Sequence, residues 1–292
     1  MSIADDIKRT FRTGSSMVKL IYINLAVFIL VNLVKVFLFF LNAQGASTGL
    51  VEWLAVPAWL PNLASRPWTV ITYMFTHENF LHILFNLLTF YWFSTIFLGY
   101  FDEKKLLNIY ILGGLFGALF YILAFNLFPV FGQWLPASYA LGASASIMAV
   151  IFAISLYVPD YSVYLVFIGR VKLKYLALFF IGLDILSIPA GNAGGHIAHL
   201  GGAFLGSMFT WQYRKGRDIT KWFGNLMDWL FTLFKRRERI KVTYRRAADD
   251  MEYNKAKMER QAEIDLILEK ISKGGYESLS KEEKDTLFKA GK

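Results

Sequence analysis

The chain has 292 residues, of which 55% are hydrophobic and 17% aromatic, and it carries a formal net charge of +9. A soluble domain of this length is rarely so apolar, so the composition argues against an ordinary soluble protein. Cys is absent, which excludes disulfide bonds, thiolate nucleophiles and cysteine metal sites.

The positive charge is distributed unevenly along the chain. Residues 1–213 have 11 basic and 8 acidic side chains, a net of +3, whereas residues 214–292 have 20 and 14, a net of +6. We expect the excess to lie beside a membrane and to attract anionic lipid, at about 1 kcal/mol per basic residue near the surface. Membrane lipid, and not nucleic acid, is the partner that this pattern predicts.

The order of apolar segments predicts an all-α, polytopic membrane protein with six transmembrane helices. The first 18 residues are polar and basic, without the pattern of a cleavable signal peptide, and form an N-terminal tail. Six later stretches are long enough to span a bilayer. A count of five or seven would require the fourth or fifth stretch to be re-entrant. The six stretches are Leu20–Leu41, Leu81–Tyr100, Leu107–Phe128, Gly142–Val158, Leu173–Pro189 and His196–Tyr213.

The positions of Lys and Arg predict the orientation of these spans. Of the 31 basic residues, 29 fall in or directly beside the N-terminal tail and the second and fourth loops, or after Tyr213. Because such residues concentrate on the cytoplasmic side, both termini are predicted to be cytoplasmic. Arg66 is the one basic residue in the other loops, and Lys35 lies within the first span, from which we expect it to extend toward the outer surface.

Residues 214–292 are predicted to form a cytoplasmic, basic, helical tail behind a membrane domain at residues 19–213. Aromatic and polar residues alternate from Ile219 to Phe234 and lead into a basic cluster at residues 235–239, as expected of an interfacial helix. Two further helical patterns from Glu263 to Ala290 are separated by glycines, and Ser280 and Glu283 form a capping box for the second. We expect a solvated tail.

The string G-A-S-A at Gly142 to Ala145 opens the fourth span. Attack of a serine hydroxyl on an amide needs a base for its proton and donors for the developing oxyanion. The first backbone N–H groups of a helix are unpaired, and Gly142 allows close approach of a substrate. Alone, the string is weak evidence for a nucleophile, and close helix packing by small residues is the favoured interpretation.

The string A-H-L-G-G at Ala198 to Gly202 opens the sixth span and adds a base. His199, Gly202 and Gly206 share one helix face. The fourth span presents small residues at spacings of four (Ala145, Ala149 and Ala153), so the two helices can approach closely. If they do, Ser144 and His199 meet near the outer end of the bundle as a dyad.

A third group lies at the start of the second span. His82 and Asn86 are four residues apart and therefore share one face, and both side chains can donate hydrogen bonds to an oxyanion. The four histidines of the chain (His77, His82, His196 and His199) all fall near the same predicted membrane face. Satisfied core histidines are the alternative interpretation.

These three motifs resemble the rhomboid family of intramembrane serine proteases. The run from Trp68 to Asn86 is similar to the family's first-loop and second-span signature, G-A-S-A to its nucleophile motif, and A-H-L-G-G-x-x-x-G to its sixth-span motif. The resemblance implies that Ser144 is the nucleophile and His199 the general base, and that His82, Asn86 and Gly142 stabilise the transition state. It implies a Ser/His dyad without metal or cofactor, substrates that are transmembrane segments cut near the outer face, and a bacterial inner membrane.

The chain departs from the family pattern at several positions. Thr69 stands where an arginine often follows Trp68, Ala145 replaces a glycine, and Met148 replaces an aromatic residue. Asp184 is an intramembrane acid outside the motifs, which we interpret as a structural acid, since an orienting role would require it to reach His199.

Two other functions are compatible with the sequence. One is a metal site or transporter that uses the four histidines, with His196 and His199 sharing an ion, although no H-E-x-x-H motif occurs. The other is a catalytically inactive rhomboid-like protein that binds transmembrane helices. The sequence does not define the substrate, the oligomeric state or the partners of the tail.

Overall fold

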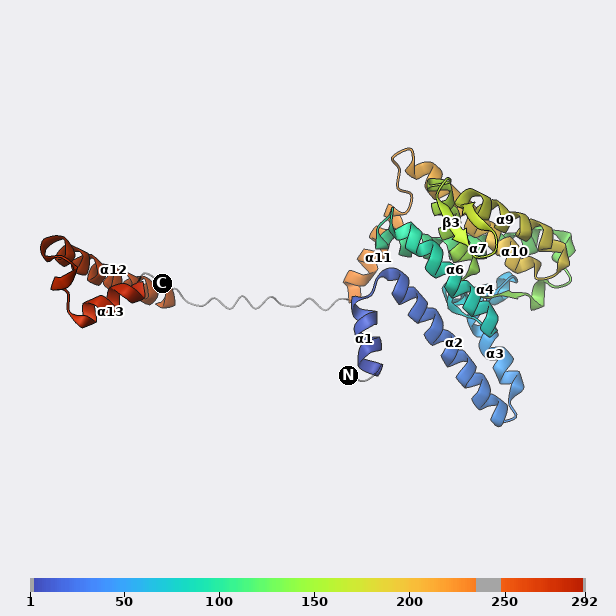
Figure 1. The fold of residues 1–292 in the computed structure, drawn as a ribbon. Helices are drawn as coiled ribbons and strands as arrows, with labels where there is room; N and C mark the ends of the chain where they lie inside the picture. The colour runs from blue at the N-terminus through green and yellow to red at the C-terminus, as the bar shows by residue number, and fades with distance from the viewer. Residues whose placement is uncertain (1–2, 235–247, 291–292) are drawn as a thin grey trace. The chain divides into compact units, whose positions relative to one another are not determined.

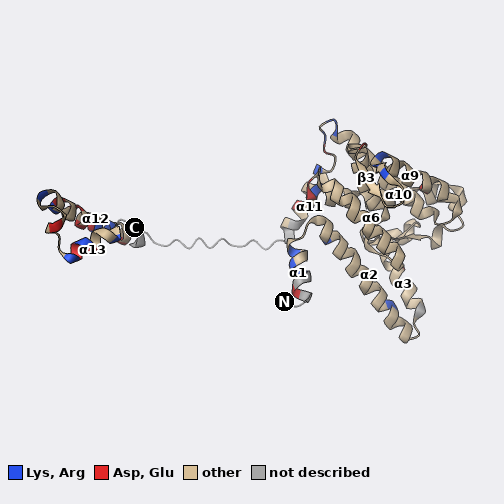
Figure 2. Cartoon of the chain, in the orientation of Figure 1, with Lys and Arg blue, Asp and Glu red and all other residues tan. Residues whose placement is uncertain are grey.

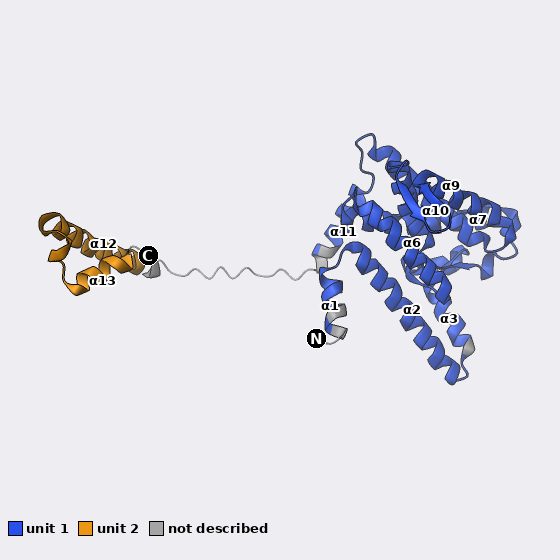
Figure 3. Ribbon diagram, in the orientation of Figure 1, with its two compact units in different colours: residues 1–234 blue, residues 235–292 orange. Residues whose placement is uncertain are grey.

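The computed structural model describes residues 3–234 and 248–290, and these divide into two compact units. Unit 1 is formed by Met1–Phe234 and unit 2 by Lys235–Lys292 (Figures 1 and 3). The basic cluster predicted at residues 235–239 lies outside the described residues.

Unit 1 is helical, and its long helices coincide with the six apolar stretches of the sequence, which confirms the all-α prediction (Figure 1). Four described helical segments are long and apolar enough to cross a membrane: Ser16–Phe40, Phe80–Leu98, Glu103–Leu127 and Leu173–Ala190. The helix Ser144–Tyr157 is apolar but shorter. The six helices that correspond to the apolar stretches are α2 (Ser16–Phe40), α6 (Phe80–Leu98), α7 (Glu103–Leu127), α8 (Ser144–Tyr157), α9 (Leu173–Ser187) and α10 (Ala193–Tyr213).

Short elements connect these helices. Two small antiparallel pairs join β1 to β2 and β3 to β4. In the first pair Val56 faces Ala140, and in the second Val163 faces Val171. The other elements of unit 1 are α1 (Ile3–Thr13), α3 (Gln44–Leu54), β1 (Val56–Pro57), α4 (Leu60–Ser65), α5 (Thr69–Thr72), η1 (Tyr73–Phe75), η2 (Pro129–Phe131), η3 (Leu135–Ala137), β2 (Tyr139–Ala140), β3 (Ser162–Leu165), β4 (Gly169–Lys172), η4 (Ile188–Ala190) and α11 (Lys221–Phe234).

Helix α8 is the centre of unit 1. Every residue from Ala145 to Ser155 is buried, because α10, α7, α6 and α9 all pack around this helix. By contrast, α2 buries only three of its residues within the unit. A helix that is apolar on all sides is buried either in a protein core, as α8 is, or in a membrane.

Glycines on α7 and α10 allow neighbouring helices to approach α8 closely. A Cβ added at Gly202 would lie 1.9 Å from the Ala145 carbonyl oxygen, and one at Gly206 would lie 2.3 Å from that of Ala149. On α7, a Cβ at Gly117 would lie 2.4 Å from the Ala145 Cβ. The predicted contact between the small faces of α8 and α10 is therefore confirmed.

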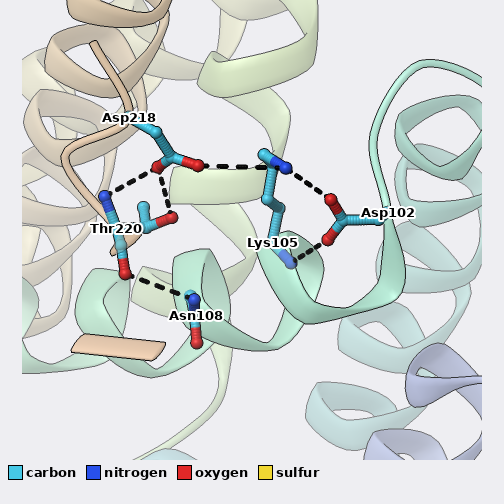
Figure 4. Close-up of polar contacts among 5 residues, drawn as sticks. All are labelled: Asp102, Lys105, Asn108, Asp218 and Thr220. Carbon is cyan, nitrogen blue, oxygen red and sulfur yellow. Dashed lines mark hydrogen bonds and ion pairs between the residues drawn. The ribbon is translucent and has the colours of Figure 1, made fainter. Parts of the chain in front are cut away.

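The N-terminal end of α7 is joined to the segment before α11 by buried and half-buried polar groups (Figure 4). Asn108 donates to the Thr220 carbonyl at 3.3 Å, and Asp218 accepts from the Thr220 backbone N–H and hydroxyl. Lys105 lies between Asp102 and Asp218. These contacts fix the start of α11, whose exposed aromatic side chains Trp222 and Trp229 share one helix face.

Charged residues are sparse along the apolar helices of unit 1 and dense in unit 2 (Figure 2). Unit 2 contains α12 (Ala248–Gly274), η5 (Tyr276–Ser278) and α13 (Lys281–Ala290). The predicted capping box is present, since Ser280 N–H donates to Glu283 Oε2 at 2.7 Å and Glu283 N–H donates to Ser280 Oγ at 3.2 Å. Lys270 of α12 also contacts Glu283, and this pair ties the two helices together.

Candidate active site

Ser144 is the first residue of α8, and the backbone before it makes a sharp turn. Gly142 has φ of +119°, a conformation that residues with a Cβ rarely adopt. Ala143 provides no side-chain cap, so the first turn of α8 begins without one. Backbone N–H groups at such a helix start point toward the space in front of Ser144 and can bind an anion.

Two residues that precede α6 hold this turn in place. The Gly142 N–H donates to the Tyr73 carbonyl at 2.9 Å, and the Ala143 N–H donates to Nε2 of His77 at 3.2 Å. The His77 side chain is fully buried. The sequence grouped His77 with the other histidines, but the role seen here, acceptor for the backbone beside Ser144, was not predicted.

His82 lies directly against the turn. A Cβ added at Gly142 would be 2.9 Å from Cε1 of His82 and 3.2 Å from Nε2, so only glycine leaves room for this ring. Asn86, one turn further along α6, donates from Nδ2 to the His82 carbonyl at 2.9 Å. An amide nitrogen has two hydrogens, and the second stays available to the cavity.

The predicted site residues meet at one cavity of about 480 Å³ between α6, α8, α9 and α10. Ser144, His199, His82 and Asn86 all line it, and Gly142 lies behind His82. The remaining lining residues include Met148, Asp184, Ser187 and His196. Residues from three motifs that are far apart in the sequence are therefore brought to one place.

Asp184 contacts both histidines of α10, which the sequence could not indicate. Its Oδ1 atom lies 2.7 Å from Nδ1 of His199 and 2.8 Å from Nδ1 of His196. A carboxylate only accepts hydrogen bonds, so Nδ1 of each ring carries a proton and Nε2 of His199 is left as an acceptor. The carboxyl side chain is 8% exposed and each imidazole 22%. Asp184 therefore reaches His199, as an orienting role requires.

The loop around Trp68 does contain an arginine contact, although Thr69 replaces the residue at which one was expected. Arg66 donates to the Glu52 carbonyl at 3.2 Å and lies over the Trp53 ring. The Trp68 indole donates to the Trp53 carbonyl at 2.9 Å. Thr69 is buried and its hydroxyl donates to the Arg66 carbonyl. Arg66 thus anchors this loop from a different position.

The fold and the site together define an integral membrane protein in which a serine, a histidine and further polar side chains line a cavity among apolar helices. The chain belongs to the rhomboid family, because the family model of the Rhomboid domain matches residues 64–216. All of the candidate site residues fall within this match.

Two further similarities extend the comparison. The chain is 31% identical over 163 residues to RHOMBOID-like protein 12, mitochondrial, of Arabidopsis thaliana. The similarity covers 53% of this chain and 48% of that protein, so the chain spans about half the length of the curated relative. Residues 249–289 match a separate family of unknown function (DUF6576), which covers nearly all of the described part of unit 2.

Proposed function

We propose that the protein is an intramembrane serine endopeptidase that cleaves transmembrane segments of other membrane proteins near the outer membrane face. The observation that carries this proposal is the shared cavity, which gathers a nucleophile, a base with an oriented imidazole and several oxyanion donors. Acyl transfer needs these three components in one place.

Ser144 acts as the nucleophile and His199 as the general base. Nε2 of His199 takes the proton from the Ser144 hydroxyl as the oxygen attacks the scissile carbonyl, and the imidazolium then protonates the leaving amine. Asp184 keeps the proton of His199 on Nδ1 and stabilises the imidazolium that forms. Water later hydrolyses the acyl-enzyme with His199 again as base.

The oxyanion is stabilised from two sides. Backbone N–H groups at the start of α8 lie on one side, and the side chains of His82 and Asn86 lie on the other. The left-handed backbone at Gly142 gives His82 the space to reach this position. His77 holds the turn through Ala143 and does not line the cavity.

A second cavity of about 690 Å³ supports the proposal that the substrate is a transmembrane segment. It lies between α6, α9 and the β3–β4 hairpin, and it shares Thr89 and Phe180 with the cavity that contains Ser144. Its walls are mainly aromatic and apolar, and Phe93 and Phe180 contact each other edge to face across it. An apolar segment that separates α6 from α9 would reach Ser144 directly from the lipid.

The test is cleavage of a model transmembrane substrate by the purified full-length chain, together with labelling by a fluorophosphonate probe. Ser144→Ala is expected to abolish both, and His199→Ala to be as inactive as Ser144→Ala, with no further loss in the double variant. Ser146→Ala is the matched control, because Ser146 lies on the same helix but is buried against Met74 and does not line the cavity. Loss of a positioned general base costs about 10²- to 10⁴-fold in rate.

The outcomes separate the proposed function from its alternatives. Retained cleavage in Ser144→Ala would refute the assignment of the nucleophile. Absence of both cleavage and probe labelling in the wild type, with binding of transmembrane helices intact, would identify the inactive rhomboid-like alternative. Zinc-dependent transport would identify the metal transporter that the sequence leaves as an alternative.

A further inference from the structure

Asp184, His196 and His199 form a ligand set that the protease reaction does not require as a whole. Their ligand atoms all lie within 4.8 Å of one another, and among the residues that the structure describes this is the one such group of three. Two imidazoles and a carboxylate are a common donor set for Zn²⁺, whereas Ca²⁺ and Mg²⁺ prefer oxygen ligands. We propose that this cluster binds Zn²⁺ and that the bound ion reversibly inhibits the enzyme.

The geometry needs only a small adjustment to accept the ion. The separations of 2.7 Å and 2.8 Å between Oδ1 of Asp184 and the two Nδ1 atoms are those of hydrogen bonds. Zinc binds such atoms at about 2.0–2.2 Å, so tetrahedral ligands lie roughly 3.3–3.5 Å apart. The two contacts with Asp184 would open by less than about 1 Å, and the remaining separation, which is within 4.8 Å, would close to the same spacing. His196 and His199 are on adjacent turns of one helix, which keeps them aligned.

An ion can reach the cluster from the cavity. Both imidazoles are 22% exposed and line the same cavity as Ser144, while the carboxylate behind them is nearly buried. His82 lines the same cavity but lies outside this group of three, and its ring contacts that of His77, with ring centroids 5.2 Å apart. Glu78 beside them is already paired with Lys35. Transport needs successive ligand groups along a path, whereas the described residues contain one group of three. This arrangement favours retention of the ion over its transport.

Zinc binding at Nδ1 would prevent His199 from acting as a base, because the ring proton would move from Nδ1 to Nε2. Without the ion, Nδ1 carries the proton and Nε2 is free to accept one from Ser144. Zinc requires the lone pair of Nδ1, so the proton of the neutral ring moves to Nε2 and none is released. Nε2 then donates and cannot accept. The inhibitory effect rests on the protease function proposed above, but the binding does not.

The binding test therefore uses the full-length Ser144→Ala variant in detergent, titrated with Zn²⁺ by calorimetry and with Co²⁺ by visible absorption. We expect one ion per chain and the absorption of a tetrahedral cobalt site. Adding His196→Ala, or the polar His196→Gln where the first variant folds poorly, should weaken binding by at least about tenfold. Absence of binding, or unchanged binding in both His196 variants, would overturn the proposal.

The inhibition test uses the active chain. Zinc should stop cleavage by the wild type, and EDTA should restore it. His196→Ala should keep measurable turnover, because His199 and Asp184 remain, and half-inhibition should need at least about tenfold more zinc. His77→Gln is the matched control, since it removes a histidine outside the cluster and should leave zinc sensitivity unchanged. Equal zinc sensitivity in His196→Ala would contradict the site, whereas cleavage by Ser144→Ala would contradict only the proposed protease function.

Discussion

Asp184 changes the chemistry that His199 can perform. The Oδ1 atom of Asp184 accepts from two imidazoles at once, and the carboxyl group is buried on α9. Hydrogen bonds to charged groups contribute about 1.5–3 kcal/mol, and in a low-dielectric cavity the carboxylate would also stabilise the imidazolium of the proposed reaction. The family resemblance implies a Ser/His dyad, whereas the geometry here favours a triad.

We predict that Asp184→Asn lowers kcat by about tenfold to a hundredfold, because the neutral amide no longer stabilises the imidazolium. KM for the model substrate and the thermal unfolding temperature should change little, since asparagine keeps the size and one acceptor. Steady-state kinetics and unfolding in detergent measure the two effects separately. A fall in unfolding temperature with unchanged kcat would restore the purely structural interpretation.

His77 predicts a pH dependence of stability. Burial lowers its pKa from the ordinary 6.5 to about 4, and its neutral ring accepts from the Ala143 N–H at 3.2 Å. The unfolded chain therefore takes up the proton first as the pH falls. The contribution of the neutral His77 ring to the free energy of unfolding is complete above pH 6.5. It declines between pH 6.5 and about 4, by roughly 3 kcal/mol over the interval at about 1.4 kcal/mol per pH unit.

The measurement is thermal unfolding in detergent across this interval. His77→Gln keeps an acceptor that does not titrate, so its unfolding temperature should fall less than that of the wild type as the pH decreases. The difference between the two proteins isolates His77 from the other histidines. Parallel pH profiles would show that His77 does not carry this dependence.

At the scale of elements, the packing of α8 against α10 decides whether Ser144 and His199 can meet. Gly202 contacts the Ala145 backbone so closely that a methyl group has no space, whereas a Cβ added at Gly182 of α9 would meet nothing within 4 Å. We predict that Gly202→Ala separates the helices, costs about 1–3 kcal/mol of stability and abolishes cleavage. Gly182→Ala should unfold at the wild-type temperature or slightly above it and retain activity.

Unfolding in detergent and the cleavage assay test this pair of variants together. Both substitutions add the same methyl group to a glycine in a helix interior, so helix propensity alone predicts the same small change for both. If Gly202→Ala retained full activity, the close α8–α10 contact would not be needed for the site.

The sequence predicts the elements well where the signal is local. Small residues at spacings of four place α8 against α10, and Ser144 and His199 each lie within the first two turns of their helices. Contact between Asp184 and His199 depends instead on how η4 folds the chain between α9 and α10, and no periodicity encodes it. The two-residue strands β1 and β2 also lack a pattern.

Helices α12 and α10 show a different limit of prediction from sequence. Helix α12 is described from Ala248, well before the predicted start at Glu263. The pattern does not predict the earlier part, because residues 248–262 are mostly polar and Met251, Tyr253 and Met258 are their only large apolar or aromatic side chains. Helix α10 is absent from the segments that qualify as spans by composition, since its five glycines and two histidines lower its mean hydropathy. The six-span count therefore stays a prediction.

At the scale of the whole molecule, charge predicts how the chain lies in the membrane. Basic residues collect in the segments that are predicted to be cytoplasmic, which include the region around the β3–β4 hairpin. Lys172 and Lys174 both pair there with Asp160, and these pairs lower its pKa to about 2. The pairing does not weaken the orientation signal, because Lys and Arg determine topology and acidic residues contribute little.

The naturally Cys-free chain allows this orientation to be tested with single cysteines and an impermeant maleimide on intact cells. Thr48 is exposed on α3, and Phe167 is 99% exposed in the hairpin turn. We predict that Thr48→Cys is labelled from outside, whereas Phe167→Cys, like Tyr276→Cys of unit 2, is labelled only after permeabilisation. Permeabilised cells provide the control for reactivity at all three positions. Labelling at Thr48 only after permeabilisation would reverse the proposed topology and place the cavity that contains Ser144 on the cytoplasmic side.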